Sequence, residues 1–90
     1  MMQLINDLVY DTETSTKIES VDNQHSEHSA FYKCTTLYKG ENGNYFLYHI
    51  TGTKQFVVEP VLEEEVIDFL CGNGFLETAV SLYPDKFKRA

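Results

Sequence analysis

The sequence predicts a single α+β domain over residues 1–90, with an antiparallel sheet of about five strands and two short C-terminal helices on one face. Two runs rich in aromatic, threonine and β-branched residues flank a turn-like segment at 40–44, which is typical of a β-hairpin. Farther along, apolar residues recur at helical spacing from Leu62 onward. A chain of this size buries roughly 60–65% of its unfolded surface, so we expect one thin hydrophobic core.

The N-terminal part predicts a hairpin between residues 7–10 and 16–21. The intervening residues 11–15, with the sequence DTETS, form a polar turn in which Asp and Thr side chains bond nearby backbone amides. Residues 16–21 alternate loosely between polar and apolar, as a strand with one exposed face does. Residues 22–29 are polar and have no periodicity, so we expect a loop.

The central hairpin, within residues 31–50, has two possible registers. A two-residue type I′ turn would pair Glu41 with Asn44, whereas a three-residue loop with Gly43 in the left-handed conformation would pair Gly40 with Asn44. We favour the second register because it matches similar side chains across the strands. It places the following pairs opposite each other: Leu37 and Leu47, Tyr38 and Phe46, and Thr36 and Tyr48.

The remaining elements are one strand and two helices. Residues 55–59 have strand composition, and Pro60 is expected to end the strand because proline cannot donate to a ladder. Residues 62–71 form the strongest helical pattern, with its inward face made of Leu62, Val66, Phe69 and Leu70. A Gly-Asn-Gly segment then caps this helix. A second helix is expected over residues 76–82, before Pro84.

Charge is high and unevenly distributed. The formal net charge is −7, and residues 1–30 carry six acidic side chains against one lysine. Residues 60–90 carry six against three basic side chains, while residues 31–59 are nearly neutral. Phosphate binding requires clustered Lys and Arg, so direct nucleic-acid binding is disfavoured. An acidic surface instead suits a protein partner with a basic surface.

The same sequence predicts a cytoplasmic protein. Its start lacks a basic leader, no run approaches 18 apolar residues, and two cysteines do not make a disulfide scaffold. We therefore expect no membrane association, and a monomer or homodimer with two reduced thiols.

The sequence gives only weak evidence for a metal-binding or catalytic site. His25, His28 and Cys34 could bind zinc with Cys71 or His49, but no Cys-x-x-Cys pair supports this interpretation. Successive glutamates at 63–65 point about 100° apart on a helix and cannot converge on one cation, so they complement the helix dipole instead. No nucleophile–base arrangement and no phosphate loop occur. We predict no cofactor, no metal and no enzymatic activity.

Aromatic residues are concentrated in the central hairpin, namely Tyr38, Tyr45, Phe46 and Tyr48. They could stack on single-stranded nucleic acid, but the basic flanks that such platforms use are sparse. Because neighbours alternate between faces, half of these rings should be core. The other half could form an exposed patch for protein contact.

Two segments carry a resemblance. Residues 9–14, VYDTET, and residues 36–48, TLYKGENGNYFLY, resemble the turn and hairpin of short, mostly uncharacterised bacterial and phage proteins, as does the acidic helix start after Pro60. The resemblance covers about half of the chain and implies a protein from a phage or mobile element, of the anti-CRISPR type. After Ile50 the chain departs from that pattern, because residues 51–55 replace a Gly-rich continuation.

Two functional hypotheses follow. In the first, the protein is a non-catalytic inhibitor that mimics phosphate charge on a basic nucleic-acid-binding host complex. Its binding residues would be Asp11, Glu13, Glu19 and Asp22, with a second patch of Glu63, Glu64 and Asp68. In the alternative, it is a regulatory or assembly protein that acts through Tyr45 and Tyr48 on an exposed aromatic hairpin and forms a homodimer.

Overall fold

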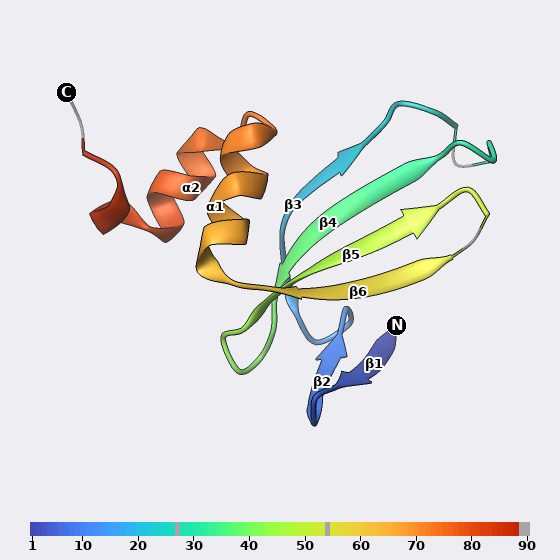
Figure 1. Cartoon of the computed structure of the whole chain (residues 1–90), viewed down its shortest axis with the longest axis horizontal. Helices are drawn as coiled ribbons and strands as arrows, with labels where there is room; N and C mark the ends of the chain where they lie inside the picture. Colours follow the sequence, from blue (N-terminus) through green and yellow to red (C-terminus); the bar gives the residue numbers. More distant parts are fainter. Residues whose placement is uncertain (27, 54, 89–90) are drawn as a thin grey trace.

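The computed structural model describes residues 1–26, 28–53 and 55–88 as an α+β protein (Figure 1). Within these ranges, a small and a larger antiparallel sheet together hold six strands, and two α-helices and a 3₁₀ turn follow toward the C-terminus. The elements are β1 (Met2–Ile5), β2 (Leu8–Asp11), β3 (Thr16–Asp22), β4 (Lys33–Lys39), β5 (Tyr45–Thr51), β6 (Phe56–Val61), α1 (Glu63–Gly72), α2 (Leu76–Leu82) and η1 (Pro84–Lys86). The fold class is therefore confirmed, with one strand more than expected.

The predicted pairing of the first hairpin is wrong. Strand β2 pairs with β1, with Ile5 opposite Leu8, and not with residues 16–21. The turn between them consists of Asn6 and Asp7, whose φ angles of 51° and 66° both lie in the left-handed region. Two such residues make the tight turn that matches strand twist, and Asn and Asp tolerate this conformation well. Residues 12–15 are therefore a link between two sheets.

The larger sheet is a meander in the order β3-β4-β5-β6. Its central hairpin has the three-residue loop that the sequence favours, because Leu37 lies opposite Leu47 and Tyr38 opposite Phe46. The backbone N–H of Gly40 donates to the Asn44 carbonyl at 2.8 Å. Gly43 has a φ of 87°, which a residue with a side chain adopts only at a cost.

Strand β6 continues through Pro60, where the sequence predicted that it would end. The Thr51 N–H donates to the Gln55 carbonyl, so odd-numbered residues of β6 direct their backbone groups toward β5. Pro60 therefore faces the open edge, where its missing N–H breaks no ladder bond.

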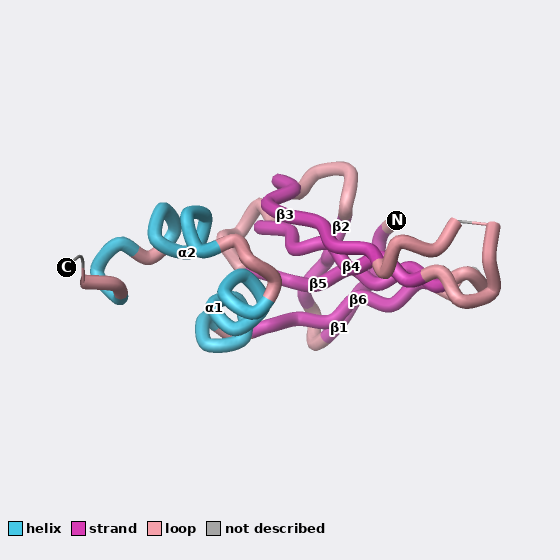
Figure 2. The backbone as a smooth tube through the Cα atoms, turned by 90° about the horizontal axis from the view of Figure 1, so that it is seen from above, coloured by secondary structure: helices cyan, strands magenta, loops and turns pink. Residues whose placement is uncertain are grey.

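The two faces of the larger sheet are covered differently. On the helix-covered face, the buried residues form one cluster of Leu37, Val61, Val66, Leu70 and Ala79. On the opposite, hairpin-covered face, a second cluster consists of Tyr10, Phe46 and Val58. The helices lie at the end of the sheet that carries the 40–44 turn, and the other end has no helix over it (Figures 1 and 2).

Both helices form where the sequence predicted them. Val66 and Leu70 are fully buried, whereas Leu62 is 75% exposed and does not belong to the inward face as expected. Leu62 instead precedes α1, and its backbone N–H donates to the Glu65 carboxylate at 3.1 Å. This bond satisfies one of the free donors at the helix start.

The long loop between β3 and β4 is held by the turn between β5 and β6. The Gly52 N–H donates to the Tyr32 carbonyl at 2.7 Å. Gly52 lies so close to this loop that any side chain there would overlap with the carbonyl of Ser29. The absence of a side chain at Gly52 thus permits the contact.

Candidate functional site

The predicted N-terminal acidic residues do not form one patch. Asp11 accepts a hydrogen bond from the Glu13 N–H at 3.0 Å, and Glu13 itself is exposed. Glu19 is half-buried and accepts a hydrogen bond from the Thr78 hydroxyl at 2.6 Å, which ties β3 to α2. Asp22 is the exposed last residue of β3, about 20 Å along the strand from Thr16, the end that lies nearer to Glu13. Glu19 therefore has an internal structural role.

The predicted acidic residues of α1 do lie together. Glu64 and Asp68 are exposed one helical turn apart, and Glu63 contacts the Lys86 ammonium at 3.5 Å. We call Glu63, Glu64 and Asp68 the acidic α1 face. Lys86 offsets one of these three negative charges, so Glu64 and Asp68 stay without a cationic partner among the described residues.

Tyr45 and Tyr48 lie on opposite faces of the sheet, as their odd spacing requires. Tyr45 packs under the helices, with its ring centroid 6.3 Å from that of Tyr83. Tyr48 lies on the hairpin-covered face and stacks on Phe56, with the centroids 6.2 Å apart. Burial, together with the neighbouring Tyr38, raises the pKa of the Tyr48 phenol. One partner surface could not include both tyrosines without rearrangement of the helices.

Few carboxylates are neutralised. Among the residues that the structure describes, one lysine–carboxylate pair forms, between Lys86 and Glu63, and the His49 ring contacts Glu59. Most of the 14 acidic side chains of the chain therefore have no cationic partner in the described ranges. The excess negative charge remains available to an external cationic group.

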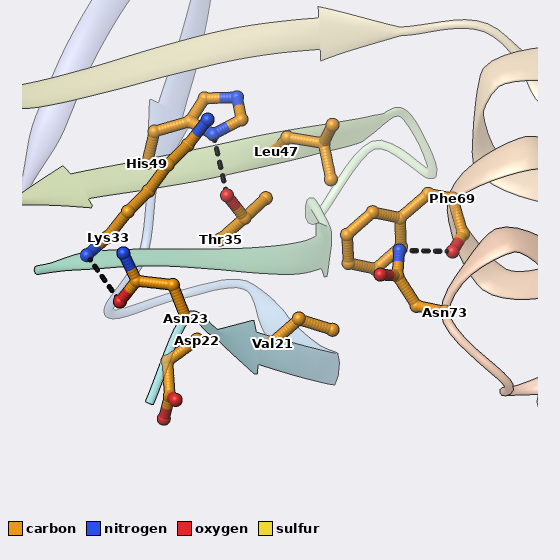
Figure 3. A pocket seen from close by; sticks show the side chains of 9 residues that line it. All are labelled: Val21, Asp22, Asn23, Lys33, Thr35, Leu47, His49, Phe69 and Asn73. Carbon is orange, nitrogen blue, oxygen red and sulfur yellow. Dashed lines mark hydrogen bonds between the residues drawn. The ribbon is translucent and has the colours of Figure 1, made fainter. Parts of the chain in front are cut away.

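A groove of about 330 Å³ lies on the helix-covered face, between the end of the sheet without helices and the C-terminal end of α1 (Figure 3). Val21, Leu47 and Phe69 provide its apolar surface. The polar residues that line it are Asp22, Asn23, Lys33, Thr35, His49 and Asn73. These residues come from β3, β4, β5 and α1 and from the segments that follow β3 and α1, so no local sequence pattern indicates the groove.

Three polar side chains beside the groove are linked across three strands. The His49 Nδ1 atom lies 2.9 Å from the Thr35 hydroxyl, and the His49 Nε2 atom lies 2.9 Å from the Glu59 carboxylate. The order of hydroxyl, imidazole and carboxylate is the one that activates serine nucleophiles. However, Thr35 lies within β4 between two partner strands, so local backbone amides serve the ladders and cannot form an oxyanion hole. We interpret the network as cross-strand packing that fixes the His49 ring.

The proposed zinc ligands are dispersed. His25 and His28 are exposed, and His25 lies beside Phe31 with ring centroids 6.0 Å apart. The Cys34 sulfur lies 3.3 Å from the Ser20 hydroxyl, on the hairpin-covered face. Within residues 1–26, 28–53 and 55–88, no three His, Cys, Asp or Glu side chains gather as metal ligands would.

Comparisons of the chain with protein-family models, curated proteins and solved structures gave no match. None of the helices in the described ranges has the length and apolar character needed to cross a membrane. Function is therefore inferred from the geometry and charge of the surface.

Proposed function

We propose that the protein is a non-catalytic binding protein of the cytoplasm that occupies a basic surface on a nucleic-acid-binding complex and inhibits it by mimicking phosphate charge. The observation that carries the proposal is the unneutralised negative charge, because among the described residues only Glu63 pairs with a lysine and only Glu59 contacts a histidine. The resemblance to short phage and mobile-element proteins supports an inhibitor of the anti-CRISPR type.

The acidic α1 face is the better candidate for the contact. Glu64 and Asp68 repel each other at a spacing of four residues, which costs an isolated helix about 0.2–0.5 kcal/mol. A cationic partner would relieve this repulsion. Glu19 is bonded to Thr78, and Glu13 and Asp22 are far apart, so the N-terminal acidic residues are a weaker candidate.

The test begins with a basic nucleic-acid-binding complex captured from host lysate and then purified. We expect its affinity for the protein to fall by about tenfold between low and high salt, because exposed charges are screened. The double variant Glu64→Gln/Asp68→Asn should bind more weakly at low salt, and added nucleic acid should compete. Salt-independent binding, or unchanged binding of this variant, would contradict the proposal.

A matched control removes the same charge elsewhere. Asp7 and Glu41 are exposed in two different turns. The Asp7→Asn/Glu41→Gln variant has the same net charge as the α1 variant, and Asn tolerates the left-handed conformation of Asp7. We expect it to bind nearly as well as the wild type. Equal weakening by both double variants would indicate an effect of net charge alone.

A second candidate function is assembly through aromatic residues on the hairpin-covered face. Phe56 is 48% exposed although it stacks on Tyr48, and such exposed rings favour protein contact. Sedimentation velocity should then show a concentration-dependent dimer that Phe56→Ser disrupts and Glu13→Lys leaves intact. A monomer at every concentration would exclude this function.

A further inference from the structure

The groove beside α1 has two chemically different ends. Near α1, the Phe69 ring and the side chains of Val21 and Leu47 form an apolar surface. At the other end lies Lys33, whose ammonium makes no ion pair or hydrogen bond with any residue in the described ranges. In Figure 3 the Lys33 side chain extends along the groove toward the His49 ring.

The other charged groups at the groove are directed elsewhere. Asp22 belongs to the hairpin-covered side of β3, where it lies opposite Cys34, and its carboxylate points away from the groove in Figure 3. The Asp22 carboxylate also accepts the Gln24 N–H at 2.7 Å. Glu59 is bonded to His49, whose second ring nitrogen is bonded to Thr35. Lys33 is therefore the charged side chain at the groove that is available to bind a ligand.

The helix dipole fixes which end of the groove would hold an anion. Phe69 and Asn73 belong to the C-terminal end of α1, where the dipole disfavours negative charge. The Asn73 amide nitrogen donates to the Phe69 carbonyl at 2.7 Å, which holds the amide beside the ring. An anionic group is thus favoured at Lys33 and an apolar ring at Phe69.

We propose that this groove binds a small molecule that joins an aromatic ring to a carboxylate, with the ring against Phe69 and the carboxylate at Lys33. The volume of about 330 Å³ lies in the range of small-ligand sites. A phosphate ester would need several converging donors, and a single lysine supplies a point charge suited to a carboxylate. This inference is independent of the proposed function, because the acidic α1 face takes no part in the groove.

The experiment is a titration of the full chain with 3-phenylpropionate, followed by amide ¹H–¹⁵N NMR. We expect saturable shifts at Val21, Thr35, Leu47 and Phe69, with a Kd on the order of 1 mM because the groove is open. Two matched probes, 3-phenylpropanamide without the charge and propionate without the ring, should each bind severalfold more weakly. Absence of saturable shifts at these amides, or equal binding of 3-phenylpropanamide, would overturn the proposal.

A pair of lysine variants locates the carboxylate. Lys33→Gln should weaken binding about threefold, as expected for one partly exposed ion pair, and Lys33→Glu should weaken it further. Lys17→Gln is the control, because Lys17 is exposed on β3 and points to the opposite face. Both side chains are exposed, so the amide spectra should show retained folds. Equal effects of Lys33→Gln and Lys17→Gln would exclude carboxylate binding at Lys33.

Discussion

The two faces of the larger sheet are covered by layers that bury different numbers of side chains against it. On the helix-covered face, both layers supply buried side chains: Leu37 and Val61 come from the sheet, and Val66, Leu70 and Ala79 from the helices. On the hairpin-covered face, Tyr10 is the one buried side chain that β1 and β2 contribute. The outer side of that hairpin carries apolar residues that are 60–67% exposed, namely Met2, Leu4 and Val9.

The difference shows where stability is concentrated. An isolated two-stranded hairpin is marginally stable in water, so β1 and β2 depend on their attachment to the sheet. Tyr10 attaches the hairpin through an edge-to-face contact with Phe46, with ring centroids 5.3 Å apart, and Ile5 packs against the same cluster. We expect the hairpin to open locally at a lower free energy than the helical layer, and four predictions test this difference.

The largest effect is expected in the helical layer. Leu70→Ala removes a fully buried side chain and should lower the free energy of unfolding by about 3 kcal/mol, because it leaves a cavity between α1 and the sheet. Urea denaturation followed by circular dichroism measures this loss. A loss below about 1 kcal/mol would show that α1 contributes little to the core.

Tyr10→Ala should have a smaller and local effect. We expect about 2 kcal/mol of destabilisation, confined to the hairpin because its anchor is lost. Hydrogen exchange should accelerate at the amides of β1 and β2 and stay slow at those of β4 and β5. Val9→Ala is the control, since Val9 is 60% exposed. Equal acceleration in all four strands would mean that the hairpin and sheet unfold together.

Thr78→Val tests the hydrogen bond that joins α2 to β3. The variant keeps the shape of the side chain but leaves the half-buried Glu19 carboxylate without its hydrogen bond, which should cost about 1 kcal/mol. Thermal unfolding measures the change, and Ser81→Ala on the exposed side of α2 should have almost no effect. An unchanged thermal stability of the Thr78→Val variant would indicate that water replaces the hydroxyl.

The smallest effect concerns alkaline pH. Burial, with a contribution from Tyr45, raises the pKa of Tyr83 to about 12. The unfolded chain loses this proton near pH 10, so the contribution of Tyr83 is complete below about pH 10 and is lost as the pH rises toward 12. Tyr83→Phe should therefore lose less stability than the wild type between about pH 9 and about pH 11. Equal losses in thermal midpoint would contradict the raised pKa.

The parts of the fold that local chemistry specifies could be predicted. The register of β4 and β5 follows from matching Leu37 with Leu47 and from the left-handed conformation at Gly43. The helix over residues 76–82 follows from its spacing and its flanking residues. These features depend on neighbours in sequence and need no knowledge of the distant chain.

The errors in pairing have identifiable causes. Asn6-Asp7 is a turn signal within a short apolar run, and the longer polar run at 11–15 obscured it. The sequence predicts that the strand ends at Pro60, because proline cannot donate to a ladder. Pro60 is tolerated within β6 because β6 lies at the edge of the sheet, and this place depends on the order of the strands. A sequence pattern gives the strand but does not say which strands lie outermost.

The candidate sites were less predictable than the fold. Tyr45 and Tyr48 are an odd number of residues apart in one strand, so the sequence alone predicts that they lie on opposite faces of the sheet. The bond between Glu19 and Thr78 joins residues 59 positions apart, and the groove combines β3, β4, β5 and α1. Contacts between residues this far apart in sequence depend on how the helices pack on the sheet.

The contact at Gly52 has a practical consequence for redesign. The β3–β4 loop and the β5–β6 turn are separate in sequence, but the Gly52–Tyr32 hydrogen bond joins them into one structural unit. A library that randomises the β5–β6 turn and leaves the β3–β4 loop unchanged would lose most members, because a side chain at position 52 overlaps with Ser29. Grafting a foreign peptide at this tip therefore requires exchanging both segments together or keeping the glycine fixed.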